Sequence, residues 1–228
     1  MRHVLLASLA SFVLGCTAPG LPQGGQGALW GYVKLVPKQG TSAGGDSYSD
    51  RRVRDAARFD YTHPTFAVVY ASGLPAAPQR AASLGLVRRG AGLEWQPSHA
   101  ALALGGALLI TNSSSAPQVV SAPLAGFLRE LTPGETATLT PTEAGELEVH
   151  ALGAGAAPAL IWVTPGAFAI ADAAGRYELR DLAPGEVEIH AWHPRLPPSV
   201  AHTITLRAGV LTRLDLEIGV DQSAGSAP

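Results

Sequence analysis

The chain has 228 residues, of which 46% are hydrophobic and 15% are charged, and its formal net charge is −2. This length allows one large or two small domains, and the apolar content is high enough for packed cores, which excludes a largely disordered chain. The charge provides no basic surface, so we expect no nucleic-acid partner. Many glycines and prolines between short alternating segments favour an all-β fold with frequent turns.

The N-terminus has the pattern of a targeting segment. Val4–Leu14 is an apolar run too short to span a bilayer, and it predicts a signal peptide over residues 1–15. The run ends in Val13-Leu14-Gly15-Cys16, which resembles a bacterial lipobox, and this resemblance implies a lipid on Cys16. The alternative is an ordinary signal peptide with an incidental cysteine. Residues 16–28 are rich in Gly, Pro and Gln and predict a flexible tether.

A lipid anchor implies a membrane as partner and an extracytoplasmic location. Thr17 follows Cys16 where an Asp would indicate the inner membrane, so the resemblance to sorted lipoproteins implies the outer membrane. Cys16 is the only cysteine, so we expect no intramolecular disulfide in the mature chain.

Residues 29–82 contain two expected strands around a charged segment. Leu29–Val36 alternates apolar and other residues, and Phe66–Ala71 is a continuous apolar run typical of a central strand. Asp50–Tyr61 holds the densest charge in the chain. Its arginines (Arg51, Arg52, Arg54 and Arg58) either form an anion or partner site or pair with the local aspartates at the surface, and the second reading is favoured.

Short apolar segments at close spacing predict a small sandwich over residues 93–164. The expected strands are Ala107–Thr111, Val119–Ser121, Phe127–Leu131, Thr136–Thr140, Glu146–Ala151 and Leu160–Thr164.

The segment Phe168–His193 predicts three strands joined by two tight turns. In Asp172-Ala173-Ala174-Gly175 the Asp can bond the backbone two residues on, and in Ala183-Pro184-Gly185-Glu186 the Pro and Gly favour a type II turn. This pattern resembles the carboxypeptidase-regulatory-like (transthyretin-like) module of the carbohydrate-binding-like folds. The resemblance implies a β-sandwich over residues 165–220, usually non-catalytic, followed by a disordered tail at 221–228.

Residues 93–164 are similar to a cupredoxin. The similarity is carried by Thr111–Val120, Pro133-Gly134-Glu135-Thr136 and Ala144–Val149. It implies where the family's copper ligands would stand, and those positions hold Gln118, Ala151, Ala154 and Ala157. Alanine has no lone pair to donate, and copper sites of this type need thiolate and imidazole. We therefore expect a cupredoxin-like fold without copper, and no cofactor.

Together these features predict an all-β chain of two β-sandwiches, a cupredoxin-like Greek key and a transthyretin/regulatory-like sandwich. The cupredoxin-like part is either inserted in the other sandwich or placed in series with it. Insertion predicts that Phe66–Ala71 pairs with strands after Phe168.

The sequence contains no nucleophile, phosphate-binding or zinc motif. Ser98 and His99 are neighbours, and a strand would turn them to opposite faces. Metal binding by His190 and His193 is disfavoured because two histidines across a strand end cannot form a site alone, although His150 or His202 could join them. Trp192, His190 and Tyr177 are candidates for a sugar-stacking surface. The alternative, which is favoured, is that Trp192 packs under the proline-rich loop that follows it.

These observations favour a non-catalytic cell-envelope lipoprotein that serves as a binding or scaffold module. Its expected partners are an envelope protein or a polysaccharide. A carbohydrate-binding module proper is the alternative function, and copper carriage or electron transfer is disfavoured because the ligands are missing.

Overall fold

The computed structural model describes residues 22, 25–37, 61, 63–75 and 81–219. The expected signal peptide, Cys16, most of the tether, the charged segment apart from Tyr61, and the expected tail lie outside these residues. Within the described part the fold is all-β, and its regular helix is one 3-10 turn at Pro123–Ala125. None of the helical structure in the described residues is long and apolar enough to cross a membrane.

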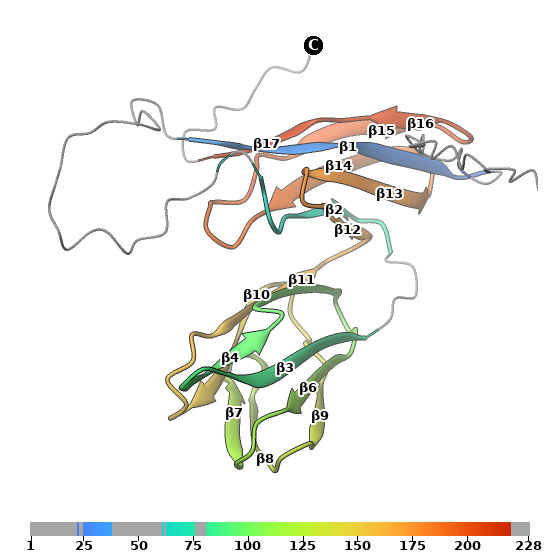
Figure 1. Ribbon diagram of the computed structural model, residues 1–228. Helices are drawn as coiled ribbons and strands as arrows, with labels where there is room; N and C mark the ends of the chain where they lie inside the picture. Colours follow the sequence, from blue (N-terminus) through green and yellow to red (C-terminus); the bar gives the residue numbers. More distant parts are fainter. Residues whose placement is uncertain (1–21, 23–24, 38–60, 62, 76–80, 220–228) are drawn as a thin grey trace, which may run out of the picture.

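The first sandwich is built from the two ends of the described chain (Figure 1). One of its sheets has the order β13-β1-β16, and β17 also pairs with β1; the other has the order β12-β2-β14-β15. These strands are β1 (Gly27–Val36), β2 (Val68–Ser72), β12 (Phe168–Ile170), β13 (Arg176–Leu182), β14 (Gly185–Trp192), β15 (His202–Leu206), β16 (Leu211–Arg213) and β17 (Leu216–Gly219). Alternate residues of the two sheets face each other and form one apolar core, which includes Leu29, Tyr177 and Ile189.

The second sandwich contains the strands between β2 and β12. Its sheets have the orders β5-β11-β10-β7-β8 and β4-β3-β6-β9. The strands are β3 (Ala82–Arg89), β4 (Gly92–Gln96), β5 (His99–Ala103), β6 (Leu108–Asn112), β7 (Gln118–Ala122), β8 (Phe127–Leu131), β9 (Thr136–Leu139), β10 (Gly145–Leu152) and β11 (Ala159–Thr164). Its core is separate from that of the first sandwich and includes Leu86, Ile110 and Ile161.

The pairing of β2 decides how the two sandwiches share the chain. β2 lies between β12 and β14, with Val69 opposite Ala169 on one side and Ala191 on the other. The pairing of Phe66–Ala71 with strands after Phe168 is therefore confirmed. The chain leaves the first sandwich after β2, builds β3 to β11, and returns at β12.

Glycine permits close backbone approach at one place in the first sandwich. Gly31 is in the middle of β1, and a Cβ on it would overlap the carbonyl of Leu214. That carbonyl accepts a hydrogen bond from the Tyr177 hydroxyl. The Leu214 N–H in turn donates a hydrogen bond to the Trp30 carbonyl, at 2.9 Å. The absence of a side chain at Gly31 thus lets the segment before β17 lie against β1.

The two sandwiches contact each other through the β12-β2-β14-β15 sheet of the first and the β5-β11-β10-β7-β8 sheet of the second. Val68, Tyr70 and Trp192 on the β2–β14 sheet pack against Ala101, Leu160 and Trp162 on the β5–β11 sheet. The described part is therefore a stack of four sheets, with an apolar contact between the second and the third.

Candidate functional site

Trp192 lies in the junction between the two sandwiches. It is 2% exposed, and its ring stacks on that of Trp162 with centroids 4.8 Å and planes 15° apart. Phe66 meets it edge-on at 6.3 Å. Trp162 of the other sandwich, rather than the proline-rich loop, supplies this stacked cover. A sugar cannot stack on this face of Trp192 while the two sandwiches remain packed.

His190 belongs to the same run of rings as Trp192, and Tyr177 does not. His190 stacks on Tyr70 with centroids 5.1 Å apart, and Tyr70 packs on Trp162 at 5.8 Å. Tyr177 lies in the core of the first sandwich, where burial raises the pKa of its phenol and the hydroxyl donates to the Leu214 carbonyl at 2.6 Å. The three residues named from sequence as a sugar surface therefore do not share one face.

The rings form a continuous row across the junction, which we call the aromatic seam. At its far end the His99 ring stacks on Phe66 with centroids 5.7 Å apart. The seam consists of His190, Tyr70, Trp162, Trp192, Phe66 and His99. Because it takes rings from both sandwiches, it fixes how one sandwich sits on the other.

The expectation that Ser98 and His99 point apart is wrong. Ser98 Oγ lies 3.0 Å from His99 Nδ1. Strand alternation does not apply to Ser98, because β5 begins at His99 and Ser98 is in the bend before it. Burial lowers the pKa of His99, so its imidazole is neutral at neutral pH. The contact joins chain neighbours at one end of the seam.

The four positions that the sequence resemblance assigned to copper ligands lie on β7, on β10 and in the connection that follows β10. Gln118 is the first residue of β7, and Ala151 is in β10 opposite Val120 of the same strand pair. Ala154 and Ala157 are in the connection from β10 to β11. Methyl groups and one amide do not fit a copper ion. Across the described residues, no three His, Cys, Asp or Glu side chains converge to hold a metal.

His150 faces outward on β10, as alternation predicts. Leu147 and Val149 are buried in the core, while His150 Nε2 lies 3.0 Å from Glu148 Oε2 on the outer face. An exposed pair of this kind contributes little to stability.

An exposed aromatic pair lies on the other outer face of the first sandwich. Trp30 and Tyr32 are alternate residues of β1 and point away from the core. Tyr32 is 39% exposed and Trp30 is half-buried, with their ring centroids 6.3 Å apart. The Arg213 guanidinium carbon lies 5.2 Å from the centre of the Trp30 ring. We call Trp30, Tyr32 and Arg213 the β1 face.

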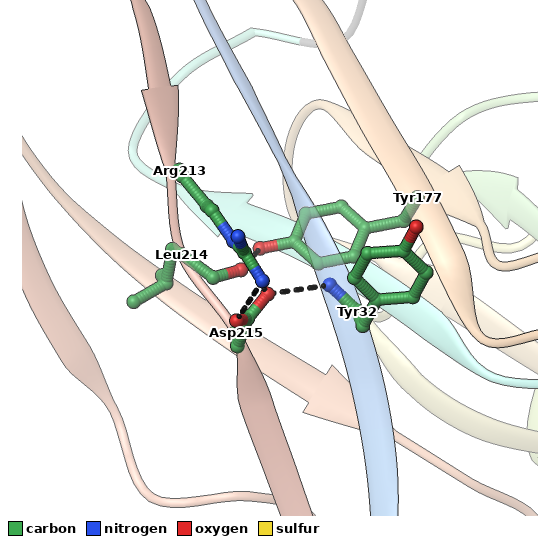
Figure 2. A network of polar contacts seen from close by, with 5 residues as sticks. All are labelled: Tyr32, Tyr177, Arg213, Leu214 and Asp215. Carbon is green, nitrogen blue, oxygen red and sulfur yellow. Dashed lines mark hydrogen bonds and ion pairs between the residues drawn. The ribbon is translucent and has the colours of Figure 1, made fainter. Parts of the chain in front are cut away.

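Asp215 fixes the β1 face from the neighbouring strand segment. Its Oδ1 accepts the backbone N–H of Tyr32 at 3.0 Å, and its Oδ2 accepts from the Arg213 guanidinium at 2.7 Å. Figure 2 shows Asp215 between these two donors, with the buried Tyr177 ring behind them. The hydrogen bond and the charge of Asp215 raise the pKa of Arg213. The result is a cation held over an aromatic ring at the surface.

Charged residues flank the β1 face on both neighbouring strands. Across from Trp30 stand Glu178 of β13 and Arg213 of β16, and across from Tyr32 stands Arg176. Neither Trp30 nor Tyr32 was predicted from sequence to belong to a binding surface. The signal was available, because both rings occupy the positions in Leu29–Val36 that alternation assigns to the outside.

Comparisons with known proteins give a distant likeness to cupredoxins. No family model and no curated protein sequence matches the chain. A purple cupredoxin from Nitrosopumilus maritimus is 18% identical, with a TM-score of 0.31, covering 36% of this chain and 98% of its own. An oxidised amicyanin variant is 19% identical, with a TM-score of 0.31, covering 40% of this chain and 91% of its own. A reduced amicyanin variant is 17% identical at the same TM-score. The chain thus has a cupredoxin-like part, and the likeness concerns its fold.

Proposed function

We propose that this protein is a non-catalytic cell-envelope lipoprotein that binds an envelope polysaccharide through the β1 face. In this proposal Cys16 carries the lipid and holds the protein on the outer membrane, outside the cytoplasm. The first sandwich is a carboxypeptidase-regulatory-like module, and the second is a cupredoxin-like module without copper.

The observation that carries the proposal is the aromatic pair on the β1 face. Trp30 and Tyr32 present ring surface on the outside of a sheet, and Asp215 holds the Arg213 guanidinium over Trp30. Aromatic faces pack on the C–H surface of sugars, and flanking charged groups orient the hydroxyls. The β1 face therefore takes the place of the surface that the sequence suggested around Trp192.

Binding to immobilised envelope polysaccharides and to a glycan array tests this proposal. Each ring stacked on a sugar is worth about 1 kcal/mol, so removing both gives about a thirtyfold loss of affinity. The variant is the double substitution Trp30→Ala with Tyr32→Ala, and circular dichroism checks that it folds. Leu128→Ala is the control, because Leu128 is 63% exposed on the other sandwich. Absence of glycan binding by the wild type, or equal binding by the double variant, would overturn the proposal.

A second candidate function is docking of an envelope protein on the second sandwich. Leu124, Leu128 and Leu152 are 77%, 63% and 51% exposed and lie on the 3-10 turn, β8 and β10, and the turn contacts both strands. Exposed leucines gathered in this way are typical of protein contacts. Cross-linking in intact cells separates the two candidates: Leu128→Ala lowers capture of a protein partner and leaves glycan binding unchanged.

A further inference from the structure

Two arginines at the β1 face are balanced by carboxylates, and a third is not. The Arg213 guanidinium lies 2.7 Å from Asp215, and that of Arg180 lies 2.8 Å from Glu178. Arg176 alternates with Glu178 and Arg180 along β13, so its side chain is on the same side of the sheet. Within the described part of the chain, no carboxylate forms an ion pair with the Arg176 guanidinium.

Arg176 is directly across from the exposed ring of Tyr32 in the antiparallel pair of β1 and β13. Side chains placed in this way share one face of the sheet, with their Cβ atoms about 5 Å apart. Asp172, four positions before Arg176, holds the turn instead: its Oδ1 accepts the backbone N–H groups of Ala174 and Arg176 at 2.9 Å each. The half-buried Arg176 thus brings a permanent positive charge to the edge of the Tyr32 ring.

The positive charge beside Tyr32 is a local feature, because the formal net charge of the whole chain is −2. Lys34, the next outward residue of β1, is exposed and adds a second cation along the strand. Glu217 of β17 is across from Lys34, so the acidic side chain of this row lies on the side of β1 away from Arg176. An anion at this surface therefore gains its affinity beside Arg176 and Tyr32, and the chain as a whole does not attract it.

We propose that the polysaccharide bound by the β1 face is acidic, and that the sugar stacked on Tyr32 is a uronic acid whose carboxylate pairs with Arg176. This rests on the polysaccharide binding proposed above and names its sugar class. The planar fork of a guanidinium matches the two oxygens of a carboxylate, whereas a neutral sugar leaves the Arg176 charge unbalanced. The ring centroids of Trp30 and Tyr32 are 6.3 Å apart, so neighbouring sugars of one polymer can each contact a ring.

Calorimetric titration of the full mature chain with polygalacturonate and with alginate tests the proposal. Each polymer is compared with its methyl-esterified form, which keeps the sugar rings and loses the charge. We expect at least one acidic polymer to bind about tenfold or more tightly than its ester, and Arg176→Gln to weaken that binding about tenfold. Arg180→Gln is the matched control: it removes an equal charge from the same strand and face, but one that Glu178 already balances, so we expect less than about a twofold loss.

The comparison of acid and ester on the wild type needs no variant, so it decides the matter even where Arg176→Gln lowers the melting temperature. Binding of neither acidic polymer, equal affinity for acid and ester, or equal losses in Arg176→Gln and Arg180→Gln would overturn the uronic acid assignment. Binding of neutral glycans alone, lost in the Trp30→Ala and Tyr32→Ala double variant, overturns that assignment and leaves the polysaccharide proposal standing. Absence of binding to any glycan overturns both.

Discussion

The buried imidazole of His193 makes stability depend on pH in a defined direction. Its pKa is about 4 in the folded chain and near 6.5 when unfolded. Between these values the unfolded chain binds a proton that the folded chain does not, so the free energy of unfolding decreases as the pH falls. Each factor of ten in proton affinity is worth about 1.4 kcal/mol. The free energy of unfolding therefore falls by about 3 kcal/mol by the time the pH reaches 4.

Denaturant unfolding of the wild type and His193→Asn at a series of pH values measures this loss. The Asn oxygen can replace Nδ1 as acceptor for the Arg195 N–H but does not titrate. We expect the wild type to lose up to about 3 kcal/mol more than the variant between about pH 7 and pH 4.

His150→Asn is the matched control, because His150 is on an outer face beside Glu148. We expect its pH profile to follow that of the wild type. Parallel profiles for the wild type and His193→Asn, or an imidazole resonance of His193 that titrates near its ordinary value, would refute the reasoning.

Three further predictions concern the architecture, each measured by denaturant unfolding. Trp192→Ala removes a ring that is 2% exposed and stacked on Trp162, so we expect a loss of about 3–5 kcal/mol, against less than about 1 kcal/mol for the exposed Tyr32→Ala. Asn112→Ala removes an amide that donates to the carbonyls of Ala116 and Leu131 at 2.8 Å each and accepts from Ser114. We expect it to lower the free energy of unfolding by about 3 kcal/mol. Asn112→Asp keeps the acceptor oxygen and loses both donors, so it shows whether the donors matter. Gly31→Ala places a methyl group against the Leu214 carbonyl and destabilises the first sandwich by several kcal/mol (about 3 or more), whereas Gly92→Ala, which meets nothing within 4 Å, leaves stability nearly unchanged. Equal losses within the tryptophan–tyrosine pair or within the glycine pair, or an Asn112→Asp variant as stable as the wild type, would contradict the corresponding contact.

Local features of the chain were predictable from sequence because their causes are local. The strand expected at Leu29–Val36 is β1, and the one expected at Glu146–Ala151 lies within β10. In the turn after β12, Asp172 Oδ1 accepts the N–H groups of Ala174 and Arg176 at 2.9 Å each, as the Asp–Gly spacing indicated. Side-chain alternation and turn chemistry act over a few residues, so a short window contains the information.

The strands β3, β4 and β5 were not predicted. Residues 82–103 contain five Ala and three Gly, which are depleted in strands, and only one Val and one Trp. β4 pairs antiparallel with β3, but β3 itself is held in its sheet by parallel pairing with β6, and β5 is held by parallel pairing with β11. Parallel pairing joins segments far apart in the chain, and no short window contains both partners.

The sequence by itself determined which side chains of a strand share a face: Trp30 with Tyr32, and His190 with Trp192. Only the tertiary structure decided which of those faces is covered. Trp162, thirty positions before Trp192 in the chain, closes over it when the sandwiches pack, while Tyr32 stays exposed on the far side. Apolar burial depends on which surfaces meet in space, and alternation within one strand carries no information about the partner that arrives from another.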